Sequence, residues 1–310
     1  MQLFASLSSA PSALMGVSMK CVCLANSGPS TAVDHMRLFR RHPDVLWEYR
    51  VHEQILPSIR RLGGQVSFAN HITIHHIGYQ EQGLRRLKLE RDLKLLRLED
   101  DERPDDPFTL FNLGAVCLEQ GDQTAALSYL ERSLAKSHPR DSIVRKLHAL
   151  IIQILRALGR PSEAMGACAR GRAQYPDDIE ILFHEALVRR ELNDLHGAKS
   201  CLQSLLAPRS DNHFASIDMS LTGYKAFHNL AVICQELGEV DRAEAAWRAA
   251  ITVRPDHTDA QVGLANLLHS QGRWKDFDLL LETLEVYPGM AGVVDDLRAR
   301  ANLTRRRPIV

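Results

Sequence analysis

The sequence has no surplus of either charge, no long apolar run and no secretion signal. Lys and Arg number 38 among the 310 residues, and Asp and Glu also number 38, so no overall field draws the chain to nucleic acid or anionic lipid. No segment approaches the ~20 apolar residues that a membrane-spanning helix needs. Residues 1–19 have no basic start and no unbroken apolar run, which argues against a signal peptide. We therefore expect a cytoplasmic protein that has no membrane span and binds no nucleic acid.

Cysteine is sparse, and the motifs of several enzyme classes are absent. The six cysteines are scattered and four of them fall in helical patterns, so a disulfide framework is not expected. Cys21 and Cys23 lie close together, but without a second pair or a histidine at zinc-finger spacing they are a weak metal signal. The sequence has no Gly-rich phosphate loop and no G-x-S-x-G, which excludes P-loop and serine-hydrolase chemistry.

A repeated pattern does occupy residues 107–288. Each copy has an apolar helix, a turn and a second helix with a packing position near its start, usually Ala. The turn residues are Gly121, Gly159, Asn193, Gly238 and Gly272. Their spacings of 38, 34, 45 and 34 residues resemble the 34-residue period of tetratricopeptide repeats. The longest step holds an insertion at residues 207–223, a loop or short extra helix that either shapes a groove or is a surface excursion.

The expected fold is therefore mainly α, a tetratricopeptide-like α-solenoid of about five helix pairs. One pair cannot cover its own apolar face, whereas a stack can. The first helix of each pair should line a groove that binds a protein or peptide partner. The candidate groove residues are Phe108, Phe111, Asn112, Lys146, Lys225, His228 and Asn229. Lys and Asn pairs that clamp a peptide carboxylate do not recur at matching offsets, which argues against a receptor for chaperone tails.

The first hundred residues follow a different, α/β pattern. Residues 19–26 and 65–79 are predicted to be strands, because apolar residues there are consecutive or alternate with polar residues. Residues 83–102 read as a long helix in which acidic residues interleave with Arg and Lys, which favours intrahelical pairing over contact with phosphate. The acidic residues at 99–102 and 105–106 are expected to be helix-end and linker charges.

Three short segments of this region resemble a known enzyme family. They are Arg37-Leu38-Phe39-Arg40, Val51-His52-Glu53-Gln54 and Ile74-His75-His76-Ile77-Gly78-Tyr79, followed by a basic helix. In this order they are similar to the C-terminal half of family-2 glycosyltransferases of the GT-A fold. Some of those enzymes continue into tetratricopeptide repeats, and some glycosylate peptides. The resemblance implies that the strands before the repeats are a small α/β remnant of a GT-A domain.

The resemblance also implies roles for individual residues. An inverting sugar transfer needs a carboxylate base for the acceptor's proton and a cation or metal for the departing diphosphate. The candidate catalytic residues are Glu53, as the base, and His52, and the candidate substrate or diphosphate residues are Arg37, Arg40, His76 and Tyr79. His76 is also the candidate ligand of a divalent metal ion, Mn or Mg. Alternatively, Glu53 pairs with Arg50 or caps a helix, and His76 is a core histidine.

The donor half of such an enzyme, a βαβ region that ends in a D-x-D motif, has no counterpart upstream of Arg37. The sequence thus starts as if in the middle of a domain, like a reading frame that is truncated, mis-started or split from a partner. A nucleotide sugar would bind only if the missing half were supplied. Three hypotheses follow: an incomplete sugar transferase whose repeats hold the acceptor, a repeat scaffold without catalysis, and a subunit that completes a transferase in trans.

The expected domain order has four parts. They are a partial GT-A-like region at residues 1–82, a connecting helix and linker at 83–106, the repeat array at 107–288, and a C-terminal helix and tail at 289–310.

Overall fold

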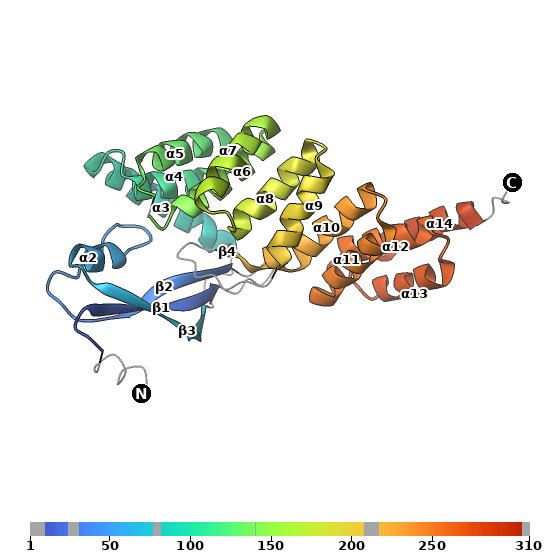
Figure 1. Cartoon of the computed structure of the whole chain (residues 1–310), viewed down its shortest axis with the longest axis horizontal. Coiled ribbons are helices and arrows are strands. Elements are labelled where there is room, and N and C mark those ends of the chain that lie inside the picture. Colours follow the sequence, from blue (N-terminus) through green and yellow to red (C-terminus); the bar gives the residue numbers. More distant parts are fainter. Residues whose placement is uncertain (1–9, 24–30, 77–81, 140, 208–216, 306–310) are drawn as a thin grey trace. The chain divides into compact units, whose positions relative to one another are not determined.

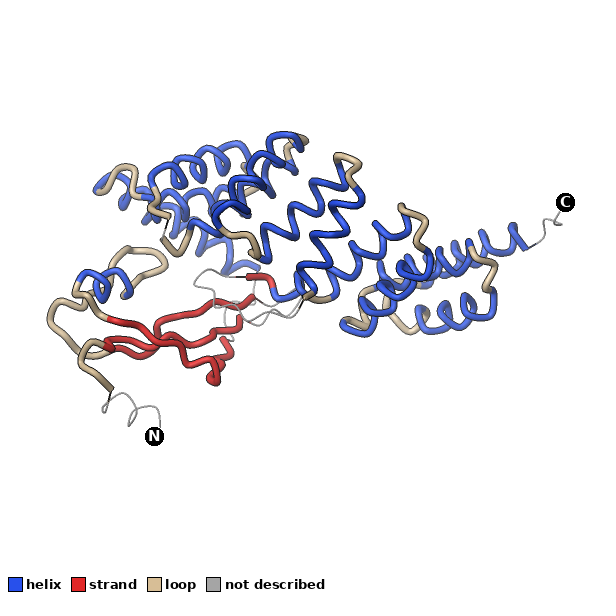
Figure 2. The backbone as a smooth tube through the Cα atoms, in the orientation of Figure 1, coloured by secondary structure: helices blue, strands red, loops and turns tan. Residues whose placement is uncertain are grey.

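The computed structural model describes residues 10–23, 31–76, 82–139, 141–207 and 217–305. Contacts between Cα atoms divide the chain into two compact units, residues 1–181 with 209–219, and residues 182–208 with 220–310. Helices dominate both units, and the strands belong to the first (Figure 2). The mainly helical fold is as predicted, whereas the predicted domain boundaries stay predictions.

The first unit contains a four-stranded sheet of order β3-β1-β2-β4. Its strands are β1 (Leu14–Cys23), β2 (Thr31–Phe39), β3 (Gln65–His76) and β4 (Ile217–Asp218). β1 runs parallel to β3 and antiparallel to β2, and β4 pairs antiparallel with β2. The sequence pattern indicated β1 and β3 but neither of the other two. β4 and a short 3-10 helix, η1 (Met219–Thr222), are the described part of the insertion.

A short helix, α2 (Leu56–Arg61), packs on one face of this sheet (Figure 1). Its buried Ile59 meets Met36 of β2, and both lie near Gly16 of β1. A Cβ atom on Gly16 would lie 2.1 Å from the terminal methyl of Met36 and 3.4 Å from Ile59, so a larger residue here would require the Met36 side chain to move. The opposite face buries a second small cluster around Val17, Met19 and Ala69.

The remaining helices of the first unit follow in sequence order. They are α3 (Gln82–Glu102), α4 (Pro107–Glu119), α5 (Gln123–Lys136), α6 (Val144–Ala157) and α7 (Pro161–Gln174). The pairs α4 with α5 and α6 with α7 cross closely because small residues stand at the crossing. A Cβ atom on Gly114 would lie 2.7 Å from the Leu130 side chain.

The second unit repeats the same arrangement. Its helices are α8 (Ile179–Glu191, whose first three residues belong to the first unit), α9 (Leu195–Leu206), α10 (Tyr224–Glu236), α11 (Val240–Val253), α12 (Thr258–Ser270), α13 (Trp274–Leu284) and α14 (Ala291–Arg305). Buried alanines let α10 and α11 pack closely around Trp247 of α11. A Cβ atom on Gly263 of α12 would lie 2.6 Å from the Trp247 ring.

The turns between paired helices explain why the helices end where they do. Gly121, Gly159, Gly238 and Gly272 have φ between 66° and 84°, and Asn193 has φ 62°. This left-handed conformation ends a helix and suits Gly best, with Asn the next choice. All five turn residues are therefore where the repeat pattern predicted them. None of the helices in the described residues combines the length and hydropathy that crossing a bilayer requires.

Candidate functional site

The residues nominated for sugar transfer lie on the sheet and on the loop between β2 and α2. His52 has φ 57°, and both His52 and Glu53 are exposed. Glu53 lines a small pocket of about 50 Å³ together with His35 of β2. Arg50, the alternative partner considered for Glu53, pairs instead with Glu99 and Glu102. The role of Glu53 as a base stays a prediction.

The two nominated arginines already have partners within the fold. Arg40 donates from Nε to the carbonyl of Leu14 at 2.7 Å and from Nη2 to the carbonyl of Ala10 at 3.0 Å. Arg37 donates to the Sγ of Cys21 at 3.6 Å. Arg40 thus holds the chain before β1 against the end of β2. A structural role accounts for its contacts without a bound diphosphate.

His76 is exposed at the end of β3, and Tyr79 lies outside the described residues. In the described parts of the chain, no three His, Cys, Asp or Glu side chains come together in a group that could hold a metal ion. A single histidine is not a sufficient ligand set for Mn or Mg, which prefer oxygen ligands. The metal ion expected at His76 stays a prediction.

The groove candidates of the first unit divide into exposed and buried side chains. Phe108 and Phe111 of α4 are partly exposed, with ring centroids 6.4 Å apart. Asn112, predicted to face the groove, is instead buried, and its Nδ2 donates to the Phe108 carbonyl one turn earlier. Lys146 donates to the buried carboxylate of Glu180 at 2.5 Å. Its charge therefore serves the packing of α6 against the start of α8.

In the second unit, the nominated side chains of α10 also have intramolecular contacts. Asn229 Nδ2 donates to the Lys225 carbonyl at 2.8 Å. His228 Nδ1 lies 3.1 Å from Nε2 of His257, just before α12, and its ring meets Trp247 edge-on at 5.0 Å. Burial lowers the pKa of both histidines, and the positive charges of His257 and Arg190 lower the pKa of His228 further. We therefore expect the two rings to be neutral near pH 7.

A cleft that the sequence analysis did not anticipate lies beside the first repeat. Its volume is about 340 Å³. It is lined mainly by Tyr49 of the loop, Leu56 and Arg60 of α2, Pro107 and Phe108 of α4, and Ile143 before α6. We call it the Tyr49–Phe108 cleft. Its rings are in contact, because the centroids of Tyr49 and Phe108 are 4.5 Å apart.

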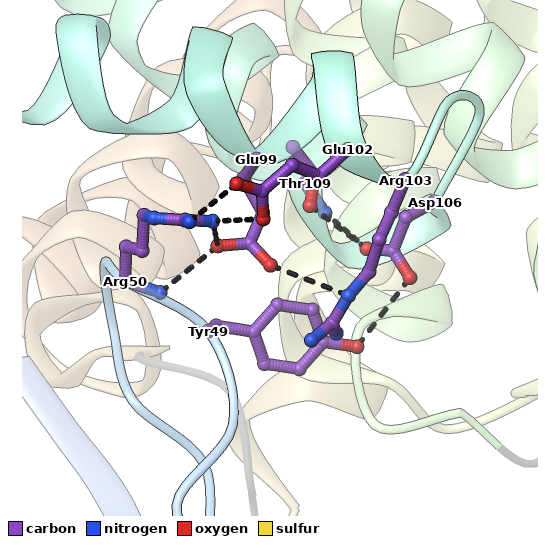
Figure 3. A network of polar contacts seen from close by, with 7 residues as sticks. All are labelled: Tyr49, Arg50, Glu99, Glu102, Arg103, Asp106 and Thr109. Atoms are coloured by element: carbon purple, nitrogen blue, oxygen red, sulfur yellow. Dashed lines mark hydrogen bonds and ion pairs between the residues drawn. The ribbon is translucent and has the colours of Figure 1, made fainter.

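A polar network fixes the loop that supplies Tyr49 (Figure 3). Both the backbone N–H and the side chain of Arg50 donate to Oε2 of Glu99, at 3.2 and 3.0 Å. The Arg50 guanidinium also makes a two-pronged pair with Glu102, at 2.7 and 2.8 Å. Glu99 is only 2% exposed, and its other oxygen lies 3.6 Å from Arg103. The last turns of α3 thus hold the loop by charge-assisted hydrogen bonds.

The same network reaches the start of α4. Asp106 caps this helix by accepting from the N–H of Thr109 at 2.8 Å, and it also accepts from the Tyr49 hydroxyl at 3.5 Å. Arg103 lies over the Tyr49 ring, 5.5 Å from its centroid. Burial raises the pKa of Tyr49 to about 12, and the charge of Asp106 contributes to the same shift. The acidic residues expected to be helix-end and linker charges do lie at the end of α3 and in the linker, and they also hold Tyr49 and its loop.

Tyr49 adopts an uncommon backbone conformation, with φ 70°. A bulky residue rarely occupies this left-handed region, at a cost of about 1–3 kcal/mol that the surroundings must offset. The network of Arg50, Glu99 and Asp106 supplies those surroundings. No local sequence signal marks this cleft, because its walls come from segments up to about ninety residues apart, from Tyr49 to Ile143.

Comparisons with known proteins support the helical repeats. Residues 231–291 match the tetratricopeptide repeat family model. A TPR repeat-containing protein of Synechococcus elongatus is 25% identical over 225 residues, which cover 71% of this chain and 45% of that protein. The aligned region thus spans less than half of the relative's length.

Solved structures agree on the fold. A tetratricopeptide repeat protein from Parabacteroides merdae has a TM-score of 0.52 and 18% identity, with 64% of this chain and 73% of that chain covered. A chain of the APC/C hetero-tetramer Cut9-Hcn1 has a TM-score of 0.55 and 15% identity, covering 70% and 40%. PilF of Pseudomonas aeruginosa has a TM-score of 0.53 and 14% identity, covering 64% and 84%. The helix pairs are therefore tetratricopeptide-like, and none of these matches supports a GT-A origin for the strands.

Proposed function

We propose that this chain is a scaffold that binds a protein or peptide partner through its tetratricopeptide-like helix pairs and catalyses no reaction itself. The observation that carries the proposal is a repeated feature, the turn between the two helices of each pair. Five left-handed turns each end the first helix of a pair, and small residues at the crossings let the pairs stack. A stack of such pairs presents a row of first helices, a surface suited to holding an extended or helical segment.

The side chains on the first helices support binding rather than chemistry. Phe108 and Phe111 stand three positions apart on one face of α4 and are partly exposed. Aromatic side chains bring a large apolar area at low conformational cost and often dominate binding energy. In the second unit the corresponding positions of α10 are Lys225 and His228, a more polar set. The two units therefore offer different contacts to a partner.

Selection from a random dodecapeptide library on the full chain, followed by calorimetry with synthetic peptides, tests this proposal. Phe111→Ala in the first unit or Lys225→Ala in the second should weaken a selected peptide by about tenfold, depending on which unit holds it. Glu131→Ala, at an exposed position of the second helix α5, is the matched control and should leave affinity unchanged. The scaffold proposal fails if no peptide is enriched, or if all three variants behave alike.

Sugar transfer by a GT-A-related site is the second candidate, and one observation favours it. His35 of β2 lies near three nominated residues. Partial burial lowers the pKa of His35, and the positive charges of nearby Arg37, His52 and His76 lower it further. Glu53 lines the same small pocket as His35. Four of the nominated side chains, Arg37, His52, Glu53 and His76, are thus near His35, which supports this candidate.

Calorimetry with a uridine diphosphate sugar, with and without manganese, tests this second candidate. Binding heat, together with turnover that Glu53→Gln abolishes and Glu131→Gln does not, would support it. Absence of both donor binding and donor hydrolysis would remove it for this chain.

A further inference from the structure

We propose that the Tyr49–Phe108 cleft binds a bulky apolar side chain of an acidic peptide segment, with Arg60 pairing a neighbouring carboxylate of that segment. This inference rests on the proposed scaffold function and assigns one binding position and one chemistry to it. The cleft belongs to the first unit alone, since all its lining residues come from residues 49–143.

The size and lining of the cleft fit a side chain of a peptide. Its volume of about 340 Å³ lies at the lower end of the range of about 300–1,000 Å³ for ligand pockets. Two aromatic rings, two prolines and the buried Leu56 and Ile143 form its apolar walls, and its polar lining residues are Gln54, Arg60, Asp141 and Ser142. The rings, prolines and aliphatic side chains favour an aromatic or branched aliphatic group, and the polar side chains can meet polar atoms beside that group.

The position of the cleft along α4 connects it to the first helix of the repeat. Phe108 lines the cleft, and Phe111 follows three positions later on the same helix face. A peptide lying along α4 would therefore pass Phe111 and place its next side chain in the cleft. The extra wall that Tyr49 and α2 provide makes the first repeat different from a bare helix pair.

The charged side chains in the cleft favour an acidic peptide segment over a basic one. The cleft has one cation, Arg60, and one carboxylate, Asp141. Asp141 already accepts from the backbone N–H of His138 at 2.8 Å. The neighbouring Arg61 pairs with Glu48 at 2.6 Å, whereas Arg60 has no ion-pair partner among the residues that the structure describes. An incoming carboxylate would pair with Arg60. An incoming Lys or Arg would meet the like charge of Arg60 and would have to share Asp141 with the backbone N–H of His138.

The strain at Tyr49 is a separate observation that points to the same place. A tyrosine at φ 70° persists because Glu99, Glu102 and Asp106 hold its loop. Strained residues gather at binding sites, where the fold fixes a side chain before the ligand arrives. Tyr49 is thus presented to the cleft with its orientation already set, which lowers the conformational cost of binding.

Fluorescence anisotropy with the full chain and defined peptides tests the inference. The probe is a fluorescein-labelled decapeptide in which Phe and Asp alternate, and the control probes replace every Phe by Ser or every Asp by Lys. We expect the Phe-Asp probe to bind at least tenfold more tightly than either control. Equal binding of the Phe-Asp and Ser-Asp probes would overturn the apolar part of the inference, and equal binding of the Lys probe would overturn the charge part.

Variants then locate the site. Arg60→Glu should weaken the Phe-Asp probe by tenfold or more, whereas Arg86→Glu, which changes an exposed cation of α3 outside the cleft, should change affinity less than twofold. Equal losses for the two variants would indicate general attraction and overturn the inference. Phe108→Leu removes one aromatic wall of the cleft and is a second test with little risk to folding. Circular dichroism confirms that each variant is folded.

The peptides selected on the full chain separate this inference from the scaffold proposal. If selected peptides bind and Arg60→Glu and Phe108→Leu leave them unaffected, the cleft is not the site although the scaffold proposal stands. If no peptide can be selected, the scaffold proposal itself fails.

Discussion

The paired helices and the strand region are stabilised by contacts of very different range. In the helices, Gly114 meets Leu130 and Gly263 meets Trp247, contacts that span sixteen residues or fewer. In the strand region, β1 pairs with β3 about fifty residues later, and β2 pairs with β4 nearly two hundred residues later. Arg50 meets Glu99 across a separation of 49 residues. The helices are thus encoded locally, whereas the strand region and the cleft depend on segments far apart in the sequence.

The helix pairs and the cleft also differ in what their residues contribute, since the former contribute mainly to stability and the latter to binding. Glycine and alanine at the helix crossings serve packing and are the same kind of feature from pair to pair. The Tyr49–Phe108 cleft instead combines a tyrosine at positive φ, a loop held by the buried Glu99, and Arg60. We therefore expect mutations in the helix pairs to change stability most, and mutations in the cleft to change binding most.

Removing the largest buried side chain of the helix pairs should have the largest effect on stability. Trp247 is 3% exposed, so Trp247→Ala leaves a cavity between α11 and α12 and should cost about 3–5 kcal/mol of unfolding free energy. Trp47 of the loop is 58% exposed, and Trp47→Ala should cost less than about 1 kcal/mol. Urea denaturation of the two variants checks the contrast, and similar losses would contradict it.

Removing the buried charge that holds the loop should have a smaller, local effect. Glu99→Gln keeps the shape but weakens two charge-assisted bonds to Arg50, so we expect a loss of about 1.5–3 kcal/mol. Glu102→Gln, at a side chain that is 58% exposed, should leave the stability nearly unchanged. Hydrogen exchange should show faster exchange at residues 48–54 in Glu99→Gln only. Unchanged exchange there would show that the network does not hold the loop.

Acidification should weaken the second unit through its histidine pair. Burial lowers the folded-state pKa of His228 and His257 below 6.5, so the unfolded state binds protons first as the pH falls. The stability of the neutral pair is therefore fully present above pH 6.5 and is lost as the pH falls through the lowered values. The variant His257→Gln should show a shallower decline of melting temperature between about pH 8 and pH 5 than the unaltered chain. Parallel curves would exclude a contribution from the pair.

The smallest expected effect concerns the one turn that uses Asn. Asn193 has φ 62°, so Asn193→Ala should cost about 1–2 kcal/mol and Asn193→Gly should be neutral or slightly stabilising. Thermal melts of the two variants give the comparison. An equal effect of Ala and Gly would mean that this turn does not depend on its left-handed conformation.

The sequence predicted the helix pairs well because their signals are short-range. A turn residue at positive φ, a small residue at the crossing and an apolar face can each be read within one repeat. It predicted β1 and β3 from their apolar residues but missed β2, where Asp34, His35 and Arg37 obscure the alternation of buried Met36 with exposed neighbours. It missed β4 because two residues, Ile217 and Asp218, become a strand only by pairing with Thr31 and Ala32.

The candidate site was less predictable. The sequence identified Arg40 as a candidate diphosphate residue and Lys146 and Asn112 as candidate groove residues. It did not predict the partners that these side chains have in the fold. Arg40 bonds backbone carbonyls, Lys146 pairs with a buried glutamate, and Asn112 bonds its own helix. A polar side chain is free for a ligand only when the fold gives it no partner, and the fold's partners are distant in sequence.

By itself, the sequence determined that this protein would be mainly helical and where its helix pairs would turn, since those features follow from the conformational preferences of single residues and their nearest neighbours. Only the tertiary structure decided which carboxylates hold Arg50, that Tyr49 takes a strained conformation, and that Arg60 faces a cleft. Those outcomes depend on segments up to about ninety residues apart coming together, and on the free energy of burying their charges and rings as one group.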